Sequence, residues 1–138
     1  MHYKGEDIKK LIPQRYPFMM VSEFESGDDT HAITRLTIAK DNYFMLPDGT
    51  MATTGLIEHM AQSCSALAGS NANSEKAPIG MIVEVKNFHC ERRPKAEETL
   101  ETSISFNFSF GNMTLAHCDC NAGEEKIAEV DLKIYVDY

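Results

Sequence analysis

The chain has 138 residues, of which 43% are hydrophobic and 25% are charged, with a formal net charge of -8 at pH 7. This length and composition predict a single globular domain with one sizeable core. The acidic balance disfavours nucleic-acid binding. The sequence has no apolar run of eighteen residues and no signal-peptide pattern, so we expect a cytoplasmic protein without membrane insertion. Its four irregularly spaced cysteines are expected to be reduced thiols.

The first third of the chain changes from helical to strand-like periodicity. Apolar residues after Glu6 and Asp7 predict a short helix that stops at Pro13. Residues 18–24 and 30–39 are then predicted to be the strands of a first hairpin. Residues 40–52 read as an irregular loop with a turn at Pro47-Asp48-Gly49.

One long apolar helix is predicted from about Thr53 to Ala68, capped by Thr53 or Thr54 and ended by Gly69. We expect it to be buried, and we expect a loop over 70–77. Alternating residues then predict four antiparallel strands, over 78–90, 100–110, 114–120 and 128–136. The class is therefore α+β, with the sheet packed on the helix. The strand face of Phe106, Phe108 and Phe110 is expected to cover that helix.

Within this helix, a single carboxylate lies among apolar and small residues, in Gly55-Leu56-Ile57-Glu58-His59-Met60-Ala61-Gln62. A charged group is costly to bury, so Glu58 is either a hydrogen-bonded structural residue or a working one. As a working residue it should line an elongated, mostly apolar pocket near the helix start, reached from the surface close to Arg92 or Arg93.

Three segments carry a family resemblance: Leu11 to Val21 (LIPQRYPFMMV), Glu58 to Gln62 (EHMAQ), and Phe88 with Arg92-Arg93-Pro94 before Thr99-Leu100. In order and spacing they resemble the hotdog-fold 3-hydroxyacyl-[acyl-carrier-protein] dehydratases. The resemblance implies a single hotdog domain over 1–138, with a curved antiparallel sheet around the central helix. It also implies a dimer with acyl tunnels at the subunit interface. The substrate would be a thioester on the phosphopantetheine arm of acyl carrier protein, and no further cofactor is implied.

Two departures from the family pattern stand out. The loop before the helix reads Tyr43-Phe44-Met45-Leu46-Pro47-Asp48-Gly49, whereas family members carry a His-Phe-Pro-Gly segment there, whose histidine works with the helix carboxylate of the other subunit. The first motif usually has histidine where this chain has Gln14. The sequence more closely resembles the divergent dehydratase-like branch of aryl polyene and related pathways.

Dehydration needs a base for the C2 proton, an acid for the leaving hydroxyl and donors for the developing oxyanion. Glu58 could supply the acid or the base. Unpaired backbone N–H groups near Thr53, Thr54 and Gly55 could supply the oxyanion donors. Gln62, one turn after Glu58, is predicted to orient it or to cap a loop.

Other polar residues have simpler interpretations. His59 lies about 100° around the helix from Glu58, so we interpret it as structural or interfacial. The run His117-Cys118-Asp119-Cys120 lacks a second ligand pair, and no metal site is expected. Arg92, Arg93 and Lys95 are either a solvated loop or a docking site for an acidic carrier protein.

Three functions remain open from the sequence. The first is dehydration of 3-hydroxyacyl chains on acyl carrier protein, in fatty acid or polyene-type synthesis, with this chain as one subunit of a homodimer or of a heterodimer with another hotdog subunit. The second is a hotdog thioesterase in which the helix carboxylate activates water. The third is a non-catalytic subunit that binds acyl chains or a carrier protein.

Overall fold

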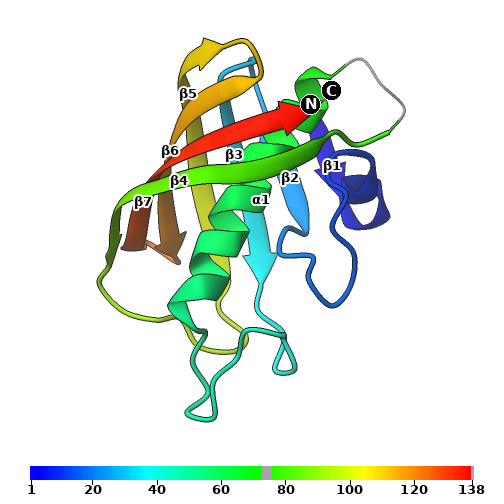
Figure 1. Cartoon of the computed structure of the whole chain (residues 1–138). Coiled ribbons are helices and arrows are strands. Elements are labelled where there is room, and N and C mark those ends of the chain that lie inside the picture. Colours follow the sequence, from blue (N-terminus) through cyan, green and yellow to red (C-terminus); the bar gives the residue numbers. More distant parts are fainter. Residues whose placement is uncertain (73–75, 138) are drawn as a thin grey trace.

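The computed structural model describes residues 1–72 and 76–137. Within them, seven strands form one antiparallel sheet in the order β1-β2-β3-β5-β6-β7-β4, which curves around helix α1 (Figure 1). The elements are β1 His2–Lys4, 3-10 helix η1 Gly5–Lys10, β2 Glu23–Ser26, β3 His31–Thr37, α1 Thr53–Asn71, β4 Ile79–Cys90, β5 Thr99–Phe110, β6 Met113–Ala122 and β7 Glu125–Asp137. One sheet around one long helix confirms the predicted α+β architecture. No described helix is long and apolar enough to cross a membrane.

The N-terminal third differs from the prediction in two elements. Strand β1 was not predicted, and β2 begins at Glu23, so residues 18–22 are not a strand. Phe18 closes a turn by donating its N–H to the Arg15 carbonyl at 2.8 Å, and Phe18 is 47% exposed. The apolar run Phe18-Met19-Met20-Val21 therefore forms a turn and a connection held against the helix, not a strand.

The core lies between α1 and the inner face of the sheet. Leu56, Met60 and Leu67 of α1 are fully buried, as expected for an apolar helix enclosed by strands. Burying each such side chain contributes about 1.5–3 kcal/mol. The helix continues to Asn71, two residues beyond the predicted end at Gly69. Gly69 is needed for close packing, because a Cβ there would meet the backbone of Leu11. The predicted loop over 70–77 contains residues 73–75, which lie outside the described residues.

Strand β5 covers α1 with its first half only. Leu100, Thr102 and Ile104 are buried, whereas Phe108 and Phe110 are 59% and 76% exposed. A register shift between Phe106 and Phe108 places Phe108 opposite the outward-facing Leu115. The prediction that Phe106, Phe108 and Phe110 form one core face is therefore wrong beyond Phe106, because this β-bulge turns the later side chains outward.

Strand β4 is an edge of the sheet, since β7 is its only neighbour among the described strands. Its first half carries exposed apolar side chains, namely Ile79, Met81, Ile82, Val83 and Val85. A long apolar edge of this kind offers unpaired backbone groups to another strand. It borders the pocket described next.

Candidate functional site

Helix α1 places Glu58 on the side that faces the start of β4. Glu58 is half-buried, although its helix neighbours are apolar or small. Burial raises the pKa of the Glu58 carboxyl above its ordinary value, and the nearby Gln62 amide lowers it by a smaller amount. The carboxyl therefore holds its proton at a higher pH than a solvated glutamate does.

Glu58 lines a pocket of about 380 Å³ between α1 and β4. The helix contributes Glu58 and, on the same face, Ala61, Gln62 and Ser65. The opposite wall is apolar or small, and Gln14 closes one side. These remaining residues are Gly80, Met81 and Ile82 of β4, Ile134 of β7, and Gln14 from the segment after η1. The pocket thus combines one ionisable group, several neutral polar groups and an apolar wall.

Gln62 ties a loop to the helix. Its Oε1 accepts a hydrogen bond from the Met20 N–H at 2.6 Å, and its Nε2 donates to the Phe18 carbonyl at 2.6 Å. The pairing matches the predicted alternative that Gln62 caps a loop. Because both ends of the amide hold backbone, Gln62 keeps residues 18–20 against the helix beside Glu58.

His59 points away from the pocket and is fully buried. Its Nδ1 lies 2.6 Å from the Met20 carbonyl oxygen, so Nδ1 is the donor. Its Nε2 then accepts from the Thr102 hydroxyl at 2.8 Å. Desolvation lowers the pKa of His59 to about 4, which leaves the ring neutral at pH 7. The structural interpretation of His59 therefore agrees with its contacts.

The start of α1 is built differently from the prediction. The N-cap is Ala52, and neither Thr53 nor Thr54 makes a side-chain cap. Instead the Ala52 N–H donates to the Phe44 carbonyl at 2.8 Å, which fixes the preceding loop to the helix. Thr53, Thr54 and Gly55 do not line the Glu58 pocket.

Gly55 permits the close approach of the loop to the helix. A Cβ at this position would lie 2.6 Å from the Phe44 Cβ and 2.8 Å from the Met51 Cγ. Phe44 packs against the core, and the loop contains no histidine. The N-terminal turn of the helix is thus covered by apolar side chains of the loop.

The predicted docking residues Arg92, Arg93 and Lys95 are outside the pocket. Arg92 forms a bidentate pair with Glu98, both N···O distances being 2.8 Å, and its Nε lies 3.0 Å from Glu125. These contacts lower the pKa of Glu98 to about 2, with the Arg92 hydrogen bonds as the main cause. Arg93 pairs with Asp48 at 3.0 Å. The expected entrance beside Arg92 or Arg93 is therefore wrong for the described pocket.

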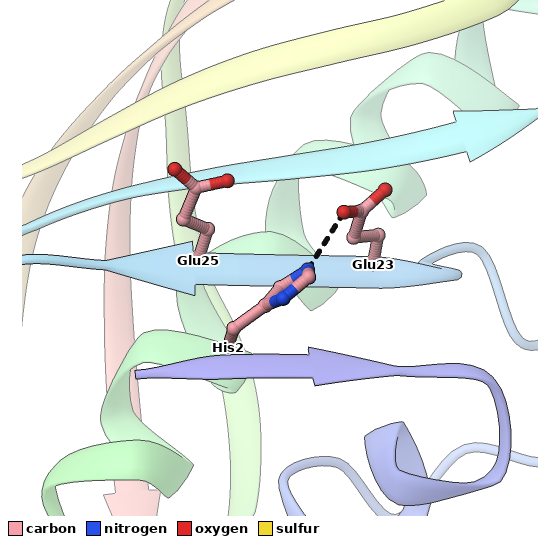
Figure 2. A group of neighbouring side chains, drawn as sticks. All are labelled: His2, Glu23 and Glu25. Carbon is pink, nitrogen blue, oxygen red and sulfur yellow. Dashed lines mark hydrogen bonds and ion pairs between the residues drawn. The ribbon is translucent and has the colours of Figure 1, made fainter.

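Two outward-facing clusters have the ligand types of a metal site. In the first, His2 Nε2 lies 2.7 Å from Glu23, and Glu25 lies alongside (Figure 2). The Arg35 guanidinium is 3.4 Å from Glu23 and 3.3 Å from Glu25. The negative charge of Glu23 and Glu25 is therefore compensated by the Arg35 guanidinium.

The second cluster is His117, Asp119 and Glu129, and Lys126 Nζ lies 2.8 Å from both carboxylates. Cys118 and Cys120 are buried on the opposite face of this strand. The side chains of the run His117-Cys118-Asp119-Cys120 therefore do not meet at one metal position.

Sequence reasoning identified Glu58 and Gln62 and missed the rest of the pocket lining. Ser65 could have been found, because it lies seven residues after Glu58 and so on the same helical face. Gly80, Met81 and Ile82 carried no such signal, since only the tertiary fold brings β4 beside α1. Gln14 stood out in the sequence only as a departure from a motif.

Comparisons with known proteins relate the whole chain to dehydratases. The family model ApeP-like, described as ApeP dehydratase, matches residues 6–137. A relative from Clostridioides difficile, 3-hydroxyacyl-[acyl-carrier-protein] dehydratase FabZ, is 25% identical over 136 residues, covering 92% of each chain.

Two solved structures share the fold. The dehydratase heterocomplex ApeI:P from Xenorhabdus doucetiae matches with a TM-score of 0.84 and 16% identity, over 95% of this chain and 91% of that one. A hypothetical thioesterase from Streptococcus pneumoniae with coenzyme A matches with a TM-score of 0.64 and 12% identity, over 82% of this chain and 83% of that one. At these identities the structural likeness establishes the hotdog fold alone.

Proposed function

Because the chain belongs to the ApeP-like dehydratase family, we propose that it acts in the dehydration of 3-hydroxyacyl groups carried as thioesters on acyl carrier protein. Glu58 is its catalytic residue. The observation that supports this role is the position of a half-buried carboxyl, with a raised pKa, in a pocket between α1 and β4. A carboxyl that retains its proton is suited to protonate a leaving hydroxyl group.

Glu58 supplies one of the two proton transfers. As the C3–O bond breaks, the hydroxyl group takes a proton from Glu58 and leaves as water. A base removes the C2 proton, and that electron pair forms the C2=C3 double bond. His59 is buried and turned away, and the loop over 43–49 contains no histidine, so the base comes from another subunit.

The partner subunit binds at β4. This edge strand exposes apolar side chains, and its residues Gly80, Met81 and Ile82 also line the Glu58 pocket. A subunit that pairs with β4 would therefore cover both the apolar edge and the pocket. The similarity to a dehydratase heterocomplex supports a second hotdog subunit, and we assign the histidine to that subunit. A homodimer of this chain would hold two carboxylates and no such base.

The carrier protein docks on the loop that follows β4. Lys95 is exposed there, on a chain whose net charge is -8, and it offers positive charge to an acidic carrier beside Arg93, which is exposed and paired with Asp48. Arg92 holds the loop through Glu98 and Glu125. The substrate arrives on the phosphopantetheine arm, and the reaction uses no other cofactor.

The test is a dehydration assay on a 3-hydroxyacyl carrier-protein substrate. The chain is mixed with a histidine-bearing hotdog partner, and Glu58→Gln is compared with Glu124→Gln, a control in an exposed turn. Loss of a positioned acid typically lowers the rate about 100- to 10,000-fold. We expect that loss for Glu58→Gln and none for Glu124→Gln. Equal activity of the two variants would contradict the assignment.

The same assay separates dehydration from the alternative of thioester hydrolysis. A carboxylate that activates water would release free thiol and a 3-hydroxy acid. We expect the enoyl thioester and water instead, since the family match is to a dehydratase and the thioesterase likeness extends to the fold alone.

A further inference from the structure

The Glu58 pocket contains a polar group whose hydrogen bonding is incomplete. Oε1 of Gln14 is buried and has no hydrogen-bond partner among the residues that the structure describes. Buried carbonyl oxygens are nearly always paired in native proteins, because an unpaired one has lost its water without compensation. Gln14 lines the pocket together with Glu58, so its amide can take the missing donor from a ligand once Oε1 turns toward the pocket.

The backbone around Gln14 is held without the help of its side chain. Arg15 Nη1 donates to the Ile12 carbonyl at 2.7 Å and to the Gln14 carbonyl at 2.9 Å. Arg15 Nη2 donates to the Lys9 carbonyl at 3.2 Å, and Ile12 is fully buried. The amide of Gln14 is thus carried on a fixed segment and is not itself used to build the fold.

The other glutamine of the pocket shows the contrast. Both ends of the Gln62 amide are hydrogen-bonded to backbone, at Met20 and Phe18. Gln62 therefore has a structural use for its polar atoms, whereas the Gln14 oxygen has none in the unliganded protein. Two residues of the same type in one pocket differ in what they leave available to a ligand.

We propose that Gln14 binds the 3-hydroxyl group of the substrate through Oε1, an inference that rests on the proposed dehydratase function. The hydroxyl donates its hydrogen to Oε1, which leaves an oxygen lone pair free to face Glu58. The C3–O bond then breaks with its electron pair going to oxygen, and Glu58 gives that oxygen a proton. The water that forms contains the substrate oxygen, its original hydroxyl hydrogen, which is hydrogen-bonded to Gln14, and the proton from Glu58.

The remaining atoms balance in the same step. The partner subunit's base takes the C2 proton, and the electron pair of that C–H bond becomes the second bond between C2 and C3. Glu58 regains its proton from solvent after the water leaves. Gln14 exchanges no proton, and it orients the leaving group toward its acid.

The test replaces the amide with an apolar side chain of similar length. Gln14→Met removes the acceptor, and Gln62→Met is the matched control because it makes the same change in the same pocket. We expect Gln14→Met to keep or raise the melting temperature, since an unpaired buried oxygen is lost. Gln62→Met should lower it, since two backbone hydrogen bonds are lost. In the assembled enzyme, Gln14→Met should lower kcat/KM about tenfold.

Binding without turnover provides the second measurement. In a Glu58→Gln assembly, a 3-hydroxyacyl pantetheine thioester should bind about 5- to 10-fold more tightly than the same acyl thioester without the hydroxyl. Adding Gln14→Met should abolish that preference. A purely structural residue would not change a preference for one hydroxyl group.

The outcomes separate the two proposals. If the wild-type assembly dehydrates its substrate and Gln14→Met keeps both kcat/KM and the hydroxyl preference, the role of Gln14 is wrong and the function stands. If the wild-type assembly shows no dehydration, the proposed function is wrong. In that case the role of Gln14 stands only if the assembly prefers the hydroxylated thioester and Gln14→Met abolishes that preference. A fall in melting temperature equal to that of Gln62→Met would also overturn it.

Discussion

Glu58 and His59 are adjacent in the sequence, and burial favours the neutral form of each by shifting their pKa values in opposite directions. The carboxyl lines a pocket and has a raised pKa, whereas the imidazole is sealed in the core and neutral. The 100° rotation between successive helix positions predicted that the two side chains would not meet. The sequence could not predict that Oε1 of Gln14 lacks a hydrogen-bond partner among the described residues, because Gln14 meets α1, β4 and β7 at one pocket only in the tertiary structure.

The buried His59 makes a prediction for the pH dependence of stability. Its pKa is about 4 in the folded protein against an ordinary value of 6.5. Between these values the unfolded chain binds a proton that the folded protein does not, so stability falls as pH falls through this window. From pH 7 to pH 5 this residue should cost about 2 kcal/mol of unfolding free energy.

The measurement is the free energy of unfolding in urea at both pH values for the wild type and for His59→Gln. His117 acts in the opposite sense, because Asp131 and Asp119 raise its pKa, so the difference between the two proteins is the useful quantity. The wild type should have the higher free energy of unfolding at pH 7, and its difference from His59→Gln should be about 2 kcal/mol smaller at pH 5. A difference in free energy of unfolding that does not change with pH would contradict a neutral, buried His59.

Among the secondary-structure elements, long periodic runs were predicted well and their ends and irregularities were not. The helix over 53–68 and the four C-terminal strands match α1 and β4 to β7 within a few residues. The bulge after Phe106 was missed because the letters continue to alternate through it. The predicted caps at Thr53 and Thr54 were wrong. The N-cap is Ala52, and its N–H donates to the Phe44 carbonyl. Phe44 belongs to a loop whose conformation the sequence pattern does not predict.

The start of α1 depends on the close approach of the preceding loop to Gly55. Gly55→Ala introduces a Cβ that would overlap Phe44 and Met51, which costs about 1–3 kcal/mol. Because alanine gains roughly 1 kcal/mol over glycine in a helix, the free energy of unfolding should fall by up to about 2 kcal/mol. Thr54→Ala, the neighbouring control, should change it by no more than about 0.5 kcal/mol, since Thr54 caps nothing.

Urea unfolding of both variants checks this account. A loss of about 1 kcal/mol for Thr54→Ala would restore the predicted cap. A stabilised Gly55→Ala would show that the loop over 42–51 can move away from the helix at little cost.

For the whole molecule, the order of elements predicted one sheet around one helix, but the pocket needed the tertiary structure. Its lining joins Gln14, the face of α1 around Glu58, the start of β4 and Ile134. The dimer was predicted from the resemblance, and the place where a partner binds is our proposal. The exposed apolar edge of β4 borders the same pocket.

Val83→Lys tests the role of this edge. Val83 is 53% exposed on β4, so a charge there should leave the fold intact and prevent association with a second subunit. Leu115→Lys is the control, with 41% exposure on β6 inside the sheet. For the chain mixed with the histidine-bearing partner, light scattering after size exclusion should show no heterodimer for Val83→Lys and a heterodimer for Leu115→Lys. Unchanged assembly of Val83→Lys would place the interface elsewhere.

In the mechanism that we propose, Glu58 of this chain and a base of another subunit form one dehydratase site. The most direct measurement is the dehydration rate of the chain alone, of a histidine-bearing hotdog partner alone, and of their equimolar mixture. We expect the mixture to exceed the sum of the separate rates by about 100-fold or more, and Glu58→Gln to remove the gain. Full activity of this chain alone, or a gain that survives Glu58→Gln, would contradict the claim.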